Sequence, residues 1–352
     1  MRKKRSVMIF VCALFFLSAC TFKWSDRQDW QSQESDAERS YQIEEQDGGN
    51  ESKPSDAQES LSDWIGQSGD HVIEHFGQPD DVGLSAYGYE WIMYEREPSR
   101  YVQFGRKENE IVTAFAFGET LNVEPFAIGH SYDDIKETVA LVRNVSVFYQ
   151  GSEYRFELTD EELSDRPLVK VSDNLFAQLY MDRFTNRLMA IRYLDGETLL
   201  KQRPYRVVYT EELPQADALA QKGERQVDES NEKQIFNITN ELRERFGVGR
   251  LRWNDQVADV AYRHSKEMNE KQYFDHVSPV SGTLENRLQH GNVQYVQAGE
   301  NIAAEYPDGI SATMGWLNSE GHRHILLHEA FTDLGVGVYE KHYTQNFIAQ
   351  EN

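Results

Sequence analysis

The sequence has little of the chemistry that cross-links small extracellular domains. Only two cysteines, Cys12 and Cys20, occur in its 352 residues. Cys12 lies inside an apolar leader, so the processed chain would keep Cys20 alone and could not form an internal disulfide. The fold must therefore be held together by its core.

The chain also lacks a long apolar run and an excess of basic residues. The apolar stretch from Val7 to Leu17 is too short to span a bilayer. Acidic residues outnumber basic ones by 59 to 36, which gives a formal net charge of −23. We therefore do not expect nucleic acid or an anionic lipid surface as the main partner, because both would be repelled. Cations and neutral ligands are compatible with this charge.

Residues 1–20 have the form of a signal peptide with a lipid-attachment site. A basic start, Arg2 to Arg5, precedes the apolar run, which ends in Leu17-Ser18-Ala19-Cys20. This ending resembles the lipobox of bacterial lipoproteins, in which the cysteine is lipidated and becomes the first residue. The resemblance implies anchoring through Cys20 at the extracytoplasmic face of the bacterial membrane, since two acyl chains hold a protein stably. An ordinary secretory leader with a chance cysteine is the alternative.

Residues 21–60 are predicted to be a disordered acidic tether. They are rich in Ser, Gln, Asp and Glu and carry few large apolar side chains, so they cannot offset the entropy of ordering. A flexible chain of this length reaches roughly 35 Å. The folded part would then be held near the membrane but lifted off it.

Residues 61–210 are predicted to form an α+β domain of two tandem helix-plus-antiparallel-sheet units, about 61–125 and 126–208. Ser68 and Ser131 are each expected to cap a helix, and strand-like sequence follows each helix. The segment from Lys107 to Asn109 is expected to be a hairpin turn. His71 and His75 have metal-ligand spacing, but a solvated helix face explains them more simply.

A polar linker, 211–231, leads to a second domain at 232–352. Helical spacing is expected from Ile235 to Phe246, from Val257 to Met268 and from about Ile310 to Ser319. An antiparallel strand pair is expected at Leu334–Tyr339 and Tyr343–Ile348. These elements predict helices combined with a short antiparallel sheet.

Four motifs in this second domain carry imidazole and carboxylate groups. They are Phe274-Asp275-His276, Gly299-Glu300-Asn301, Trp316 to Arg323, and His342-Tyr343-Thr344-Gln345. Their order and spacing resemble the CAP superfamily, which includes cysteine-rich secretory and pathogenesis-related proteins and many bacterial relatives. The resemblance implies an α-β-α sandwich.

Residues 61–210 contain Gly77-Gln78-Pro79 and the run Tyr87 to Trp91. With these motifs they resemble the domain that often precedes CAP domains in spore-forming Gram-positive bacteria.

The CAP resemblance implies a cleft with two histidines and two acids. His276 and Glu300 match the first histidine and the first acid. Glu320 is taken as the second acid, although many relatives have it one residue earlier, where this chain has Ser319. His342 is taken as the second histidine.

Such a group of residues could bind a divalent cation, zinc or magnesium. His276 and His342 would be the ligands, and Glu300, Glu320 and His322 would be further ligands or would support them. The catalytic candidates are the two histidines and two acids of the cleft, His276, Glu300, Glu320 and His342. His264, His324 and His328 are expected to be packing or surface residues.

Three hypotheses about function follow. The first is a non-enzymatic, lipid-anchored module that binds a small molecule, lipid, peptide or envelope component with metal assistance. The second is a metal-dependent hydrolase that cleaves peptides or envelope polymers, although the chain has no His-Glu-x-x-His or Gly-x-Ser-x-Gly run. The third is a structural adaptor that acts through residues 61–210.

Overall fold

The computed structural model describes residues 59–95, 100–216 and 221–350. The expected signal peptide, with Cys20, and nearly all of the expected tether lie outside these residues. Within the described ranges, no helix has both the length and the apolar character needed to cross a membrane. The proposed anchor at Cys20 therefore stays a prediction.

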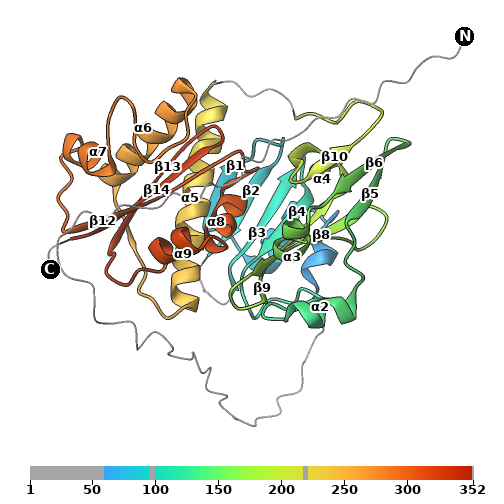
Figure 1. The fold of residues 1–352 in the computed structure, drawn as a ribbon. Helices are drawn as coiled ribbons and strands as arrows, with labels where there is room; N and C mark the ends of the chain where they lie inside the picture. The colour runs from blue at the N-terminus through green and yellow to red at the C-terminus, as the bar shows by residue number, and fades with distance from the viewer. Residues whose placement is uncertain (1–58, 96–99, 217–220, 351–352) are drawn as a thin grey trace, which may run out of the picture. The chain divides into compact units, whose positions relative to one another are not determined.

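The N-terminal region is built on two antiparallel sheets (Figure 1). The larger sheet has seven strands in the order β1-β2-β3-β4-β9-β8-β7, and the smaller has three in the order β10-β6-β5. The larger sheet contains β1 (Asp81–Leu84), β2 (Glu90–Tyr94), β3 (Val102–Lys107), β4 (Glu110–Ala116), β7 (Leu168–Lys170), β8 (Leu175–Asp182) and β9 (Arg187–Asp195). The smaller contains β5 (Asn144–Tyr149), β6 (Ser152–Glu157) and β10 (Arg206–Val208).

The two expected helix starts are confirmed. Ser68 caps α1 (Gly69–Phe76) by accepting a hydrogen bond from the His71 amide, and Ser131 caps α2 (Tyr132–Thr138) through the Asp134 amide. These bonds satisfy amide groups that a helix start leaves free. The remaining helices of this region are η1 (Leu61–Trp64), α3 (Asp160–Asp165) and α4 (Gly196–Gln202).

The strands of the two expected units join in one sheet. The turn between β3 and β4 is confirmed, with Glu108 and Asn109 both at positive φ. Strand β4 then pairs with β9, a strand of the second unit, and this pairing completes the seven-stranded sheet. Periodicity along the chain indicates strands but does not say which distant strands pair, so the sequence did not predict this join.

The C-terminal region begins with a long helix, α5 (Gln221–Arg245), which starts inside the predicted linker. The first part of α5 is polar, which is why its helical character was not expected from apolar spacing. The other helices are α6 (Asp255–Lys271), α7 (Leu284–His290), α8 (Gly309–Leu317) and α9 (Glu320–Leu326). The strands are β11 (Arg252–Trp253), β12 (Gln297–Ala304), β13 (Asp333–Tyr339) and β14 (His342–Ala349), in the sheet order β11-β13-β14-β12.

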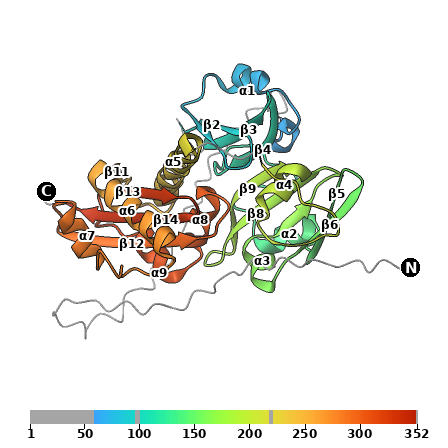
Figure 2. The same ribbon diagram turned by 90° about the horizontal axis from the view of Figure 1, so that it is seen from above.

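The C-terminal sheet lies between layers of helices. Helix α6 packs on one face, where Gly335 and Gly337 of β13 allow a very close approach: a Cβ at Gly337 would lie 1.9 Å from the backbone nitrogen of Tyr262. Helix α5 packs on the other face, where Gln345 of β14 donates to the Thr239 hydroxyl. The arrangement can be followed in Figures 1 and 2. The expected α-β-α sandwich and the hairpin of β13 and β14 are confirmed.

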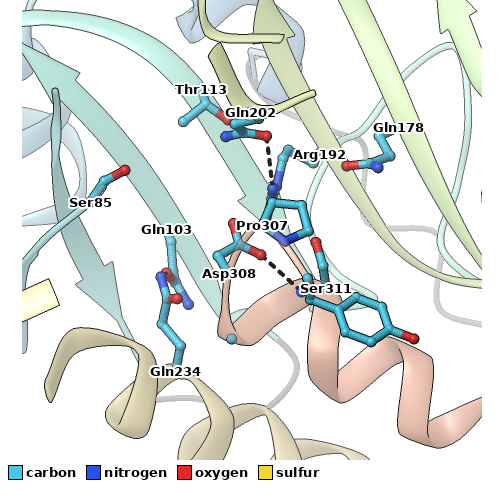
Figure 3. A network of polar contacts seen from close by, with 12 residues as sticks. Ser85, Gln103, Thr113, Gln178, Arg192, Gln202, Gln234, Pro307, Asp308 and Ser311 are labelled. Atoms are coloured by element: carbon cyan, nitrogen blue, oxygen red, sulfur yellow. Dashed lines mark hydrogen bonds and ion pairs between the residues drawn. The ribbon is translucent and has the colours of Figure 1, made fainter. Parts of the chain in front are cut away.

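One hydrophobic core includes side chains from both regions. Trp91 and Phe115 of the seven-stranded sheet belong to the same buried cluster as Ile235 of α5 and Trp316 of α8. A buried polar network accompanies this contact, and Figure 3 shows Arg192, Gln103 and Gln234 within it. The N-terminal region is therefore packed directly against the CAP-like region through apolar and polar contacts.

Candidate functional site

Two of the predicted residues, His276 and Glu300, meet at β12, an edge strand of the C-terminal sheet. Glu300 and Asn301 are successive residues of this strand, so their side chains point to opposite faces. Glu300 contacts His276, in the loop after α6, and Arg287 of α7. Asn301 contacts Gln345 and the backbone of α9. The strand thus links two groups of polar residues.

Glu300 is the buried centre of the first group. Its Oε1 lies 2.9 Å from Nδ1 of His276, and its Oε2 forms an ion pair with Arg287. The side chains of Glu300 and Arg287 are each only 4% exposed, whereas that of His276 is 28% exposed. Arg287 also donates to the carbonyl oxygens of His276 and Gly282 at 2.8 and 3.2 Å. The histidine is held from two sides but remains accessible.

The protonation of this pair follows from its surroundings. Burial alone would raise the pKa of Glu300, but the hydrogen bond from His276 and the charge of Arg287 outweigh it, so the pKa lies below its usual value. An ionised carboxylate can only accept a hydrogen bond, so the N–H at Nδ1 of His276 donates a hydrogen bond to Glu300. In the neutral ring, Nε2 then carries a lone pair and can accept a hydrogen bond or bind a cation.

His322 of α9 is the second imidazole near this strand. Its Nδ1 lies 2.9 Å from the Ser319 hydroxyl, and its carbonyl accepts from Asn301 at 3.2 Å. Burial, with a smaller effect of the charge on His276, lowers the pKa of His322 to about 4. His322 is therefore neutral near pH 7. We call His276, Arg287, Glu300, Ser319 and His322 the edge site.

His264 of α6 adjoins the edge site. It is fully buried, and neither ring nitrogen has a hydrogen-bond partner within the part of the chain that the structure describes. Burial lowers its pKa to about 4, and the charges of Glu300 and Arg287 act on it with opposite signs. A buried imidazole without a partner is unusual, because burying a polar group costs free energy unless it is hydrogen-bonded.

The structure does not bring His342 to the edge site. His342 is the first residue of β14 and pairs with Ala304, whereas Glu300 pairs with Asn346, four positions along. At roughly 3.3 Å per residue this offset is about 13 Å. Nδ1 of His342 instead lies 3.4 Å from Nδ2 of Asn269. Its pKa is lowered by burial, partly opposed by the nearby Glu305 and Glu340.

Glu320 and the other candidate histidines also lie elsewhere. Glu320 is the exposed first residue of α9 and lines a hollow of about 590 Å³ with Arg323 and His324. His71 and His75 lie against the ring of Trp64, at centroid distances of 5.0 and 5.1 Å. Ser319, one residue earlier, is the N-cap residue of α9 and has an extended backbone. Ser319 contacts His322 in place of Glu320.

A metal ion would find few free donors at the edge site. Within residues 59–95, 100–216 and 221–350, no group of three or more His, Cys, Asp and Glu side chains is arranged to hold one. Both oxygens of Glu300 already bind His276 and Arg287. Two imidazoles remain, whereas catalytic zinc usually has three protein ligands. The residues therefore do not fit a catalytic zinc centre.

Two residues of this neighbourhood, Arg287 and His264, were not among the predicted site residues, and His264 was expected to be a packing or surface residue. Arg287 gave no signal, because an arginine in a short polar helix is normally exposed. His264 did give one: it falls on the apolar stripe of α6 with Ala261 and Met268, which indicates burial. A buried histidine beside a predicted acid would have justified including it.

The fold agrees with the class that the sequence motifs indicated. A family model described as the cysteine-rich secretory protein family, CAP, matches residues 236–351, and one described as CAP-associated N-terminal matches residues 65–205. A relative that is 44% identical over 288 residues covers most of both regions. The chain belongs to the CAP family and carries a CAP-associated N-terminal domain.

Three similar proteins come from bacteria. The 44% identical relative is the uncharacterized membrane protein YlbC of Bacillus subtilis (strain 168), with 82% of this chain and 83% of the relative aligned. A crystal structure of an extracellular protein containing a SCP domain from Bacillus anthracis str. Ames is 44% identical, has a TM-score of 0.82 and covers 86% of this chain and 99% of its own. A cysteine-rich secretory protein from Staphylococcus aureus Mu50 has 25% identity, a TM-score of 0.71 and coverage of 82% and 95%.

Proposed function

We propose that this protein is a ligand-binding module of the bacterial cell envelope, anchored to the extracytoplasmic face of the membrane through lipidated Cys20. The leader that ends in Leu17-Ser18-Ala19-Cys20 supports the anchor. Two relatives support the compartment, since one is described as a membrane protein and the other as extracellular. The edge site is the proposed binding site.

The observation that carries the binding proposal is the orientation of His276 by a buried carboxylate. Glu300 and Arg287 are almost inaccessible and form an ion pair, and this buried pair holds the one accessible imidazole, that of His276, in a fixed orientation. Such a carboxylate–histidine pair fixes the ring and its tautomer. The arrangement supports recognition of a group that donates a hydrogen bond to Nε2 of His276.

The side chains beside His276 indicate what else the ligand contains. Phe274, Val277 and Val280 are 45%, 55% and 71% exposed in the same loop. Adjacent exposed apolar side chains often mark a binding surface. A ligand with hydrogen-bond donors and an apolar portion fits, and envelope peptides and lipids have both.

The donor set favours binding over metal-dependent hydrolysis. His276 and His322 could together hold a hydrated divalent cation, such as zinc or magnesium, with two nitrogen ligands. A cation held in this way would attract an anionic group of a ligand. The hydrolase hypothesis requires turnover that chelators abolish, and this can be measured on the same preparation.

Binding of purified residues 21–352 to isolated cell-wall sacculi, to lipid vesicles and to Zn²⁺ alone tests the proposal. The double variant His276→Ala/His322→Ala should weaken binding about tenfold or more, equivalent to about 1.4 kcal/mol. His290→Ala, an exposed histidine of α7, is the matched control and should bind normally. His342→Ala separates the sequence-based assignment of the second histidine from the edge site. If the double variant binds as the wild type does, the edge site is not the binding site.

A further inference from the structure

Residues of the N-terminal domain bind the segment at the start of α9 that contains Ser319 and His322. Asn318, which directly precedes Ser319, makes two hydrogen bonds with the end of β8 and the residue after it. Its Nδ2 donates to the Met181 carbonyl at 2.7 Å, and its Oδ1 accepts from the Arg183 amide at 3.0 Å. An asparagine side chain thus continues the backbone pairing of a hairpin from another domain.

Arg323, which directly follows His322, makes the second attachment. Its Nη1 and Nη2 donate to the two carboxylate oxygens of Asp182 at 3.0 and 3.1 Å. Asp182 is fully buried, and Arg323 is 15% exposed. The guanidinium also lies over the rings of Phe184 and Phe246, at 4.8 and 4.6 Å. A two-pronged, stacked arginine of this kind has a defined geometry that a lysine could not reproduce.

Asp182 is itself fixed within the N-terminal domain. It accepts from the Phe184 amide at 3.0 Å and from the Thr185 hydroxyl at 2.9 Å. The carboxylate is therefore placed by its own hairpin before it meets Arg323. The turn that follows β8 therefore holds the Asp182 carboxylate in one position, to which Arg323 binds.

Helix α9 has little internal means of fixing this geometry. It contains seven residues, and its N-cap residue Ser319 makes no side-chain capping bond. Helices this short are not stable by themselves, so their conformation depends on tertiary contacts. The two attachments flank Ser319 and His322 by one residue on each side. Within the CAP domain, α9 also contacts β12, where the His322 carbonyl accepts from Asn301, and its last residue, Leu326, is buried and accepts from Arg243 of α5.

We propose that the hairpin Met181–Thr185 of the CAP-associated domain is a positioning element of the edge site. Asp182 and Asn318 are positioning residues, which set the orientation of His322 through the segment between them. A second part of this inference rests on the proposed ligand-binding function. Ligand binding at His322 and docking of the N-terminal domain are then coupled, so each favours the other, because coupling between two sites is reciprocal. The CAP-associated domain is then part of the binding apparatus.

The test compares two variants of residues 21–352 that each remove one charge from the contact between the domains. Asp182→Asn keeps the shape of the side chain but breaks the pair with Arg323. Asp308→Asn breaks the pair between Arg192 and Asp308 and leaves the hairpin contacts intact. Arg323→Lys is a milder variant that leaves no buried charge without a partner, in case Asp182→Asn does not fold.

Two readouts report on position without any ligand. One is the NMR signal of the His322 ring, and the other is hydrogen exchange of the Arg323 amide, which donates to the Ser319 carbonyl at 2.7 Å. In Asp182→Asn and Arg323→Lys we expect a displaced or broadened signal of the His322 ring. We also expect the backbone amide at position 323 to exchange about tenfold faster, because the segment opens locally. Asp308→Asn should leave both readouts as in the wild type.

The results separate the positioning role from the proposed function. If Asp182→Asn lowers overall stability but leaves the His322 signal and the Arg323 exchange unchanged, the pair merely holds the domains together and the inference is wrong. If the wild type binds neither sacculi nor Zn²⁺, the binding proposal fails while the two readouts still decide the positioning role. If it binds, Asp182→Asn should lose more affinity than Asp308→Asn.

Discussion

Arg192 of β9 and Asp308, the N-cap residue of α8, form a buried ion pair between the two domains, with 2.8 Å between Nη2 and Oδ2. Figure 3 labels both residues. Arg192 is completely inaccessible, and its Nη1 also donates to Gln202 at 3.2 Å. The same region contains a hydrogen bond from Gln234 of α5 to Gln103 of β3. Each charge of this buried pair needs the other, because an isolated buried charge is very unfavourable.

Asp308→Asn should destabilise the protein by about 3–5 kcal/mol, because it leaves Arg192 buried without a counter-charge. Asparagine is as good an N-cap as aspartate, so the helix start, where Oδ1 of Asp308 accepts from the Ser311 amide at 2.9 Å, is retained. Denaturant unfolding measures the loss. The double variant Arg192→Met/Asp308→Asn should recover part of it. A loss below about 1 kcal/mol in the single variant would show that the pair is not buried as described.

The two domains should unfold in one transition. The core cluster that contains Trp91 and Phe115 of the N-terminal domain also contains Ile235 and Trp316 of the CAP domain, so neither half can lose its packing alone. Calorimetry checks this, because a single transition has equal calorimetric and van't Hoff enthalpies. Two resolved peaks would contradict the shared core.

Glu300→Gln should cost about 3–5 kcal/mol, because it removes the charge that compensates the buried Arg287. The matched control is Asp259→Asn, which breaks the exposed pair between Asp259 and Arg263 on α6 and should cost less than about 1 kcal/mol. Urea unfolding of both variants gives the comparison. Equal losses of unfolding free energy in the two variants would mean that the buried pair of Glu300 and Arg287 stabilises the protein no more than an exposed pair does.

Stability should fall as the pH drops from 7 to about 4.5. His264 and His322 have pKa values of about 4 in the folded protein, below the usual 6.5, so the unfolded chain binds more protons in this window and stability is lost as the pH falls. The expected loss is about 2 kcal/mol per histidine, at about 1.4 kcal/mol per pKa unit. Below about pH 4 the dependence on these groups ends.

The difference between the wild type and His264→Leu isolates this effect. The groups that act on His264 are Glu300, Arg287, Glu267 and His276, and they remain in the variant. Carboxyl groups with raised pKa values, such as Asp228 at about 7, act in the opposite direction and cancel in the difference. Parallel stability curves for the two proteins would contradict the burial of His264.

Cys20→Ala should release the protein from the membrane. Without the thiol there is no lipid attachment, and the leader alone provides no apolar segment long enough to span a bilayer. Fractionation of cells that express the wild type and the variant measures the change. If the variant stays in the membrane fraction, another element anchors the chain.

The local signals in the sequence predicted many of the helices and strands. Ser68 and Ser131 begin helices, and a tight turn joins β13 to β14, because capping and turn formation depend on residues a few positions apart. The motifs also predicted that His276 and Glu300 would meet. The polar start of α5 was missed because apolar spacing is weak there and packing, rather than periodicity, stabilises it.

What the sequence determined by itself is therefore many of the helices and strands, the CAP resemblance and the meeting of His276 with Glu300. Only the tertiary structure decided that β4 pairs with β9, that Ser319 and His322 lie at the edge site while His342 lies about 13 Å along the strand, and that Asp182 meets Arg323. These are contacts between residues far apart in the chain. Their register and partners depend on how whole elements pack, which no local pattern encodes.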